Sequence, residues 1–223
     1  MRRRQAFTLI EVMMAVAIMS IIGLSIAGAS IALTNAYDNG QEYYECIQTG
    51  RVTMLRLEKM VRTSLLVTEA NMYGSLWLWR EDTNGDGRIN VSELSWIMWN
   101  AQGRELYHNR IVFPDYWSAY MVDMHDSEVN INQANSENIV MFVYESYGPY
   151  LSETVLADDV TSFDVAASPE APHAKTVTIT MTITRGGREI TLRSAVSLRA
   201  DRTDHVAWVP DGYWGPGYWT LVD

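Results

Sequence analysis

The chain has 223 residues, a formal net charge of −10 at neutral pH and a sequence pI of about 4.8. This acidic balance argues against nucleic acid and anionic membrane surfaces as partners, because both repel negative charge. A single cysteine, Cys46, excludes an intrachain disulfide framework. Roughly 190 residues follow the apolar N-terminal segment, which is enough for one medium-sized domain with its own core.

The N-terminal segment combines a basic leader with a long apolar run. Residues 2–4 are arginines, and from Val12 to Leu33 the only polar side chains are three serine hydroxyls. Because a helix of about 20 apolar residues crosses a bilayer, the run predicts one membrane-spanning helix with its leader on the cytoplasmic side. A secretory signal peptide is the alternative, since small residues that suit a cleavage site occur at 27–30.

Glu11 directly precedes this stretch and is the one charged side chain between Phe7 and Leu33. A carboxylate in a membrane helix costs about 2.5–3.5 kcal/mol on insertion scales, so such a group is usually functional and paired. A signal peptide has no use for it, and Glu11 therefore favours a retained anchor. The alternative interpretation is that Glu11 only snorkels to the membrane interface.

Residues 5–11, QAFTLIE, and their continuation FTLIEVMMAVAIMSIIGL resemble the processing site of type IV prepilins and type II secretion pseudopilins. The resemblance implies that a dedicated peptidase cuts between Ala6 and Phe7 and N-methylates the new terminus. It also implies that Glu11 pairs with the terminal amine of a neighbouring subunit, which supplies the cation that a buried carboxylate requires. The family usually has glycine where this chain has Ala6.

The helix is predicted to continue beyond the apolar run, from about Thr8 to about Val67, with an amphipathic second part. Apolar residues on one face are expected to pack on a sheet. They are Ile47, Met54, Leu57, Val61 and Leu65. Gly40 and Gly50 are expected to loosen or kink the helix.

Strand patterns occupy the rest of the chain. Short apolar and aromatic runs predict strands, with a turn at 100–103. These runs lie at 75–79, 94–99, 105–108 and 139–144. The clearest hairpin alternates apolar residues with threonine over 175–184, turns at 185–188 and returns over 189–199. Residues 113–138 are polar and indicate no clear element.

A long N-terminal helix followed by an antiparallel sheet is an α+β arrangement, and it is also the order of elements in pilins. The segments 49–51, 155–163 and 197–199 are similar to the larger minor pseudopilins of the J class and to W-type minor pilins. This second resemblance is a pattern of short segments, whereas the N-terminal match is close and specific.

Residues 82–93, DTNGDGRINVSE, fit the D-x-[DN]-x-[DN]-G-x5-E pattern in full and resemble the calcium loops of EF-hands and dockerins. Ca²⁺ takes six to eight oxygen ligands, supplied by loop positions 1, 3, 5, 7, 9 and 12. The corresponding ligands are Asp82, Asn84, Asp86, the Arg88 carbonyl, Asn90 directly or through water, and a bidentate Glu93. The predicted cofactor is therefore Ca²⁺.

The segments on either side of this loop look like strands, whereas an EF-hand has helices there. A static calcium staple joining two strands is therefore favoured over a helix pair that opens on binding. The alternative is an Asn/Gly/Asp turn that binds no metal.

The C-terminal tail, 201–223, gathers three tryptophans and two tyrosines among glycines and prolines. One interpretation is a surface on which glycans or a partner subunit stack. The alternative is a segment folded back over the domain.

Five segments summarise the predicted organisation. They are the leader 1–6, a transmembrane and filament-core helix 7–33, its amphipathic continuation 34–68, an extracytoplasmic β-rich domain 69–200 and the tail 201–223. The predicted function is a non-enzymatic minor pilin or pseudopilin of a type IV pilus-like or type II secretion filament. Its expected partners are other pilin or pseudopilin subunits, prepilin peptidase and the bacterial inner membrane, which it spans once with the C-terminal domain periplasmic or extracellular.

Two other functions fit the residues. The first is a single-pass anchored module that binds ligands in a calcium-dependent way, with glycans as candidates for the tail. The second is a secreted enzyme behind a plain signal peptide. The mass of the N-terminus separates the three, because they predict starts at methylated Phe7, at Met1 and near Ala32.

Overall fold

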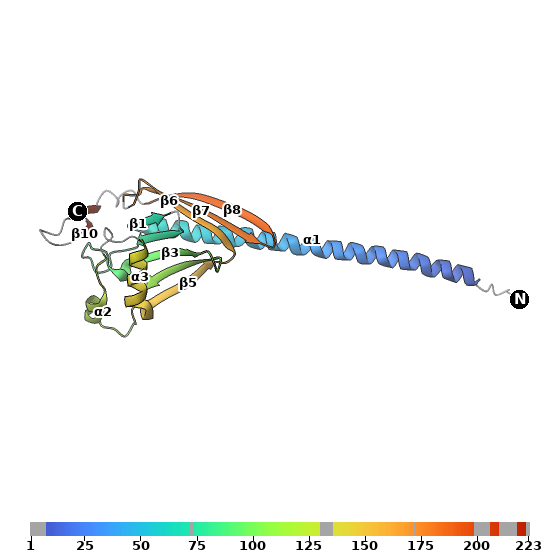
Figure 1. Ribbon diagram of the computed structural model, residues 1–223, viewed down its shortest axis with the longest axis horizontal. Helices are drawn as coiled ribbons and strands as arrows, with labels where there is room; N and C mark the ends of the chain where they lie inside the picture. Colours follow the sequence, from blue (N-terminus) through green and yellow to red (C-terminus); the bar gives the residue numbers. More distant parts are fainter. Residues whose placement is uncertain are drawn as a thin grey trace. The chain divides into compact units, whose positions relative to one another are not determined.

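The computed structural model describes residues 8–71, 74–129, 136–171, 173–198, 206–209 and 218–221. Its chain forms two compact units, residues 1–45 and 46–223. Helix α1 (Leu9–Thr63) supplies the first unit and the beginning of the second, as the blue to cyan ribbon of Figure 1 shows. The remaining helices and the strands belong to the second unit.

In the described part of the first unit the chain is the N-terminal part of α1, whose surface is apolar all round from Leu9 to Leu33. Its leucine, isoleucine, valine and methionine side chains between Leu9 and Leu33 are exposed. The hydroxyls of Ser20 and Ser25 donate to the carbonyl oxygens of Val16 and Ile21 at 2.8 and 2.9 Å, so they are satisfied within the helix. By length and composition, α1 is able to cross a membrane.

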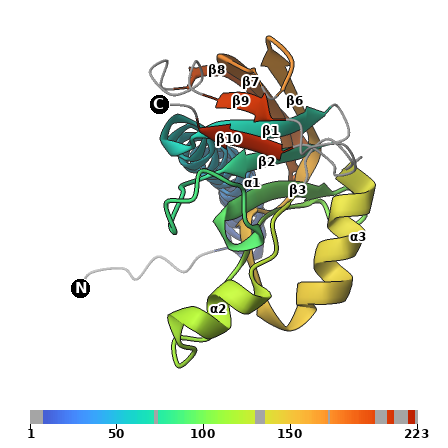
Figure 2. The same ribbon diagram turned by 90° about the vertical axis from the view of Figure 1, so that its left-hand side faces the viewer.

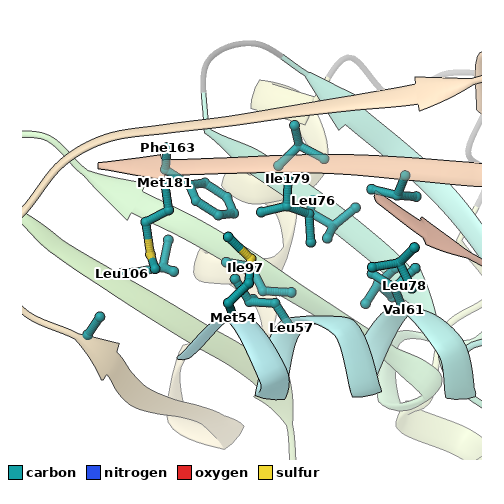
Figure 3. Packing of buried hydrophobic residues seen from close by; sticks show 14 of the residues in the cluster. Met54, Leu57, Val61, Leu76, Leu78, Ile97, Leu106, Phe163, Ile179 and Met181 are labelled. Carbon is teal, nitrogen blue, oxygen red and sulfur yellow. The ribbon is translucent and has the colours of Figure 1, made fainter. Parts of the chain in front are cut away.

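In the second unit, α1 buries one face in the main core. Met54, Leu57 and Val61 are buried there and pack with residues of both sheets, as Figure 3 shows. Gly50 also lies on this face, and a Cβ at Gly50 would come within 2.5 Å of Leu192 Cδ1. A side chain at position 50 would therefore require Leu192 to shift, and α1 continues without a break through both Gly40 and Gly50.

The helix ends at Thr63, earlier than the predicted Val67. Hydroxyls compete with the helical hydrogen bonds at this point, because Ser64 Oγ donates to the Val61 carbonyl at 2.7 Å. Residues Leu66–Asn71 instead form strand β1, so the helix predicted to continue through residue 68 is wrong at its end. A buried apolar run as short as 65–67 suits a strand as well as a helix.

The first sheet is antiparallel and has the order β1-β2-β3-β4-β5. Its further strands are β2 (Ser75–Trp79), β3 (Leu94–Asn100), β4 (Glu105–Ile111) and β5 (Leu151–Ala157). Alternation along β2 divides its side chains between two cores. Leu76 and Leu78 join the core against α1, whereas Trp77 and Trp79 join a second core on the other face.

The second sheet has the order β6-β7-β8, with β6 at Val160–Ser168, β7 at Thr176–Arg185 and β8 at Arg188–Ser197. The predicted hairpin is confirmed. Its loop consists of Gly186 and Gly187, whose φ angles of +57° and +74° suit the primed turn that such a short loop requires. Ile179 and Met181 of β7 point into the main core, as Figure 3 shows.

A long excursion between β4 and β5 carries two further helices, α2 (Ala119–His125) and α3 (Ser136–Tyr147). The strand predicted at 139–144 is wrong, because these residues lie within α3. Val143 and Tyr147 of α3 are buried, one helical turn apart, in the second core. A six-residue apolar run does not distinguish a strand from a buried helix face.

Short elements complete the second unit. They are the 3-10 helices η1 (Val91–Glu93) and η3 (Gly148–Tyr150), and the strands β9 (Val206–Val209) and β10 (Tyr218–Leu221). The last two pair antiparallel, with Trp208 opposite Trp219. The rest of the predicted aromatic tail lies outside the described residues. A long N-terminal helix followed by antiparallel sheets confirms the predicted α+β class.

Candidate functional site

The start of α1 is fixed by a capping box between Thr8 and Glu11. The backbone N–H and the hydroxyl of Thr8 donate to Glu11 Oε2 at 2.9 and 3.0 Å. In return, the Glu11 N–H donates to Thr8 Oγ1 at 3.4 Å. Sequence reasoning assigned a role to Glu11 and missed Thr8, although the T-x-x-E spacing is the recognised signature of such a box. The predicted cleavage residues Ala6 and Phe7 lie outside the described residues.

The predicted calcium loop joins β2 to β3 through η1, so strands do lie on both sides of it. The half-buried Asp82 accepts hydrogen bonds from the N–H groups of Gly85 and Gly87 at 2.8 and 3.0 Å. Both glycines have φ angles above +70°, which L side chains rarely adopt. Asp86 accepts from the Arg88 N–H at 2.7 Å. The aspartates thus hold a tight chain of turns.

Glu93 closes the loop from its far end. The residue is only 2% exposed. Its Oε1 accepts from the N–H and hydroxyl of Thr83 at 2.6 and 2.9 Å, and its Oε2 accepts from Trp79 Nε1 at 3.1 Å and from the Asn90 N–H at 3.3 Å. All four donors are uncharged groups. Hydrogen bonds to an ionised acceptor are stronger than neutral ones, so they compensate part of the cost of burial.

The remaining predicted ligands lie along the same loop. Asn84 is exposed, and its Nδ2 donates to Asp86 Oδ2 at 2.8 Å. Asn90 is buried beside Glu93, and Arg88 is at the surface. Among the described residues, no group of three or more His, Cys, Asp or Glu is placed so that it could hold a metal ion. Asp82, Asp86 and Glu93 share one loop, and their carboxylates are not gathered on one point.

A segment of the β4–β5 excursion pairs with this loop, which the sequence analysis did not foresee. Asn90 and Glu128 form an antiparallel bridge, and the Val129 N–H donates to the Ile89 carbonyl at 2.8 Å. Arg88 and Glu128 form an ion pair at 2.8 Å. No local pattern marks this contact, because the paired residues are far apart in the sequence.

Asp126 makes a further link between the two segments. Its carboxylate accepts from the N–H of Ser92 at 2.9 Å and from the hydroxyl of Ser92 at 2.5 Å. Burial raises the pKa of the Asp126 carboxyl above its ordinary value, while the two bonds from Ser92 act in the opposite direction. The loop is therefore held from outside as well as by its own turns.

Residues 1–27 match the family model of the prokaryotic N-terminal methylation motif. No curated protein matches the sequence. The motif indicates a type IV pilin-like prepilin that is processed by a prepilin peptidase and assembles with other pilin subunits. The apolar N-terminal helix followed by antiparallel sheets is a pilin-like α+β architecture, and it is consistent with a membrane-anchored pilin.

Proposed function

We propose that the chain is a structural minor subunit, either a minor pilin or a minor pseudopilin, of a type IV pilus-like or type II secretion filament. One observation carries this proposal: the methylation motif over residues 1–27 runs without interruption into α1, whose apolar part is followed by a β-rich unit. The subunit acts by assembly rather than catalysis. After processing, the second unit lies on the periplasmic or extracellular side.

The capping box suggests how Glu11 serves two stages of this function. Before assembly, the carboxylate takes its hydrogen bonds from Thr8 within the same chain. After cleavage between Ala6 and Phe7, the amine of Phe7 is free, and that of a neighbouring subunit supplies a positive charge to Glu11. A buried carboxylate gains most from such a charged partner, because an unpaired charge in an apolar bundle is strongly destabilising.

Filament fractions from cells that express the chain test this proposal. Wild-type protein should be present in sheared or detergent-extracted filaments as a minor component. Glu11→Ala should reach the membrane normally but be depleted from the filament fraction, because the neighbour's amine loses its counter-charge. Equal amounts of wild type and Glu11→Ala in that fraction would contradict the pairing role.

We also propose that residues 82–93 bind Ca²⁺, which would staple β2 to β3. Asp82, Asn84, Asp86, the Arg88 carbonyl, Asn90 and Glu93 would hold it, and all of them offer the oxygen ligands that Ca²⁺ prefers. Because the carboxylates are not gathered on one point in the structure, binding would require their side chains to turn toward the ion. The buried Glu93 supports this proposal, because its hydrogen-bond donors are uncharged and a cation would compensate its charge further. A calcium-dependent anchored binding module is the alternative function that this site would serve.

A further inference from the structure

The connection between β4 and β5 is far longer than the sheet requires. Ile111 and Leu151 are antiparallel partners in the sheet, yet residues 112–150 lie between them. Two residues are enough to join antiparallel neighbours. The connection carries α2, α3 and η3, so it is a folded insertion rather than a simple turn. We call residues 112–150 the excursion.

An aromatic cluster links the segment before α2 to the end of α3. The ring of Phe113 stacks on Trp117 at 5.4 Å and contacts Tyr150 at 5.6 Å. Tyr147 contacts Phe113 at 6.3 Å, and its hydroxyl donates to the His125 carbonyl at 2.8 Å. These contacts tie the end of α2 to α3, so the surface of α2 is a fixed feature rather than a loose loop.

Helix α2 and the residues just before it expose aromatic and apolar side chains. None of the residues of α2 is buried, and Figure 2 places this helix at the outer edge of the second unit. Tyr116 is 86% exposed, Tyr120 70% and Met124 62%. Phe142 of α3 is also exposed, and its ring contacts that of Tyr147 at 5.8 Å. Tyr120 and Met124 lie one turn apart on α2, and exposed apolar side chains that share a surface mark interaction sites.

The charge of the excursion has one sign. From residue 111 to residue 174 the sequence contains no lysine or arginine. The excursion carries six carboxylates: Asp115, Asp123, Asp126, Glu128, Glu137 and Glu145. Asp115, Asp123 and Glu145 are exposed. A second copy of this face would bring like charges together, so charge complementarity favours a positively charged partner.

We propose that residues 115–124 of the excursion form a docking surface for an arginine- or lysine-rich segment of a partner protein. Guanidinium and ammonium groups would lie over the exposed rings of Tyr116 and Tyr120, while Asp115 and Asp123 attract them to the surface. Arginine suits both contacts best, because it stacks on rings and bonds carboxylates in pairs. The proposal goes beyond filament assembly and does not depend on calcium.

A binding titration tests this surface. The full chain in detergent micelles is added to a fluorescently labelled peptide of alternating arginine and glycine. Peptides with glutamine or glutamate in place of arginine are the comparison probes, and fluorescence anisotropy gives Kd. Tyr116→Ala and Tyr120→Ala remove the rings, and the double variant Asp115→Asn with Asp123→Asn removes the charges without changing shape. Tyr44→Ala and the double variant Glu170→Gln with Glu189→Gln are matched controls, because these residues are exposed outside the excursion.

The arginine peptide should bind, more weakly as salt is raised, and the other two peptides should not. Each tyrosine variant should weaken binding about 2- to 5-fold, as expected for an exposed cation–π contact, and the controls should bind like wild type. Equal loss in the controls would overturn the proposal, since it would show attraction to net charge alone. A neutral oligosaccharide serves as a further probe. If the tyrosine variants lose binding of this oligosaccharide but bind the arginine peptide as well as wild type does, the proposal is overturned.

Discussion

Thr8 and Glu11 are the two residues that define the beginning of the anchor helix. Each side chain accepts a hydrogen bond from the backbone N–H of the other residue, so neither side chain enters an apolar environment without a hydrogen-bond partner. This local pairing reduces the cost of holding a carboxylate near a membrane before any neighbour is present.

Thr8→Val should loosen the first turn of α1, because it removes the hydroxyl that donates to Glu11 and accepts from its N–H. Loss of such a cap typically costs about 1 kcal/mol. Amide hydrogen exchange of residues 9–12 in the full chain should therefore accelerate about fivefold. Thr34→Val is the control, because the hydroxyl of Thr34 bonds to the Ser30 carbonyl inside the helix. Unchanged exchange in Thr8→Val would contradict the capping role.

His108 gives the second unit a dependence on pH. Burial, followed by the positive charges of Arg110 and Arg80, lowers the pKa of the His108 imidazole from its ordinary value of about 6.5. Its Nε2 lies 3.0 Å from Ser95 Oγ. The folded state therefore favours the neutral ring, and protonation favours the unfolded state.

The stabilisation from neutral His108 is complete above the ordinary pKa and is lost as pH falls through the lower folded value. Thermal unfolding of the full chain should therefore show a melting temperature that decreases between about pH 7 and about pH 5. His108→Gln should flatten this decrease, because glutamine keeps a polar partner for Ser95 and does not titrate. The same slope in wild type and His108→Gln would assign the pH dependence to other groups.

At the scale of elements, the predicted strands at 75–79, 94–99 and 105–108 are confirmed as β2, β3 and β4, and the hairpin is the prediction with the clearest period. The hairpin of β7 and β8 alternates over ten residues and turns on two glycines, so sequence alone determines its register. The run at 139–144 has no such alternation, and it became part of α3 because its surroundings bury one helical face. Local pattern does not contain that tertiary information.

The candidate loop, residues 82–93, also combines features that the local sequence predicts with contacts that it does not. Its turns follow from Asp82, Asp86 and the glycines, which are local signals. The strand-like segment at 127–129 that pairs with the loop is distant in sequence, and its contacts with Ile89 and Val91 follow only from the folded arrangement. Sequence could therefore predict the turns of the loop but not the segment that supports it, and calcium binding by the loop stays a prediction.

The close approach of α1 to β8 can be tested at Gly50. Gly50→Leu should destabilise the full chain by about 1–3 kcal/mol, because the added side chain would overlap Leu192 in a packed core. Gly40→Leu is the matched control, since a Cβ at Gly40 meets nothing within 4 Å. Chemical unfolding followed by tryptophan fluorescence measures both. Equal stability of the two variants would show that Gly50 does not determine this packing.

Calcium should raise the melting temperature of the full chain if loop 82–93 binds it. Ligand bound only to the folded state stabilises by about 2.7 kcal/mol at a hundredfold excess over Kd. Extracellular modules commonly bind Ca²⁺ at about 10⁻⁴–10⁻³ M, so millimolar concentrations are needed. Mg²⁺ should have a smaller effect, because it demands a tighter octahedral shell.

Glu93→Gln and Asp82→Asn should each remove most of the difference between the melting temperatures in calcium and in chelator. This holds whatever effect the substitutions have on the melting temperature in chelator. Asp164→Asn, an exposed carboxylate on β6, should leave that difference intact. Identical melting temperatures of the wild type in chelator and in millimolar Ca²⁺ would show that the loop is an ordinary polar turn.

For the whole molecule, the methylation motif and the α+β architecture together indicate a precursor with three parts: a leader, an apolar helix and a β-rich unit. Under the proposed function, the leader would be removed, the apolar helix would serve as an anchor and then as a filament component, and the second unit would present its surfaces outside the membrane. The acidic excursion would give this subunit a contact that is separate from the packing of its apolar helix in the filament. These steps all begin with one cleavage.

The intact mass of the chain extracted from bacterial membranes tests that cleavage most directly. Removal of residues 1–6 and addition of one methyl group should give a protein that begins with N-methyl-Phe7, and peptide sequencing should place the methyl group on that residue. In a strain without prepilin peptidase the leader should remain. A mature chain that retains the arginines at 2–4 in the presence of the peptidase, or one that begins near Ala32, would contradict a pilin-like function.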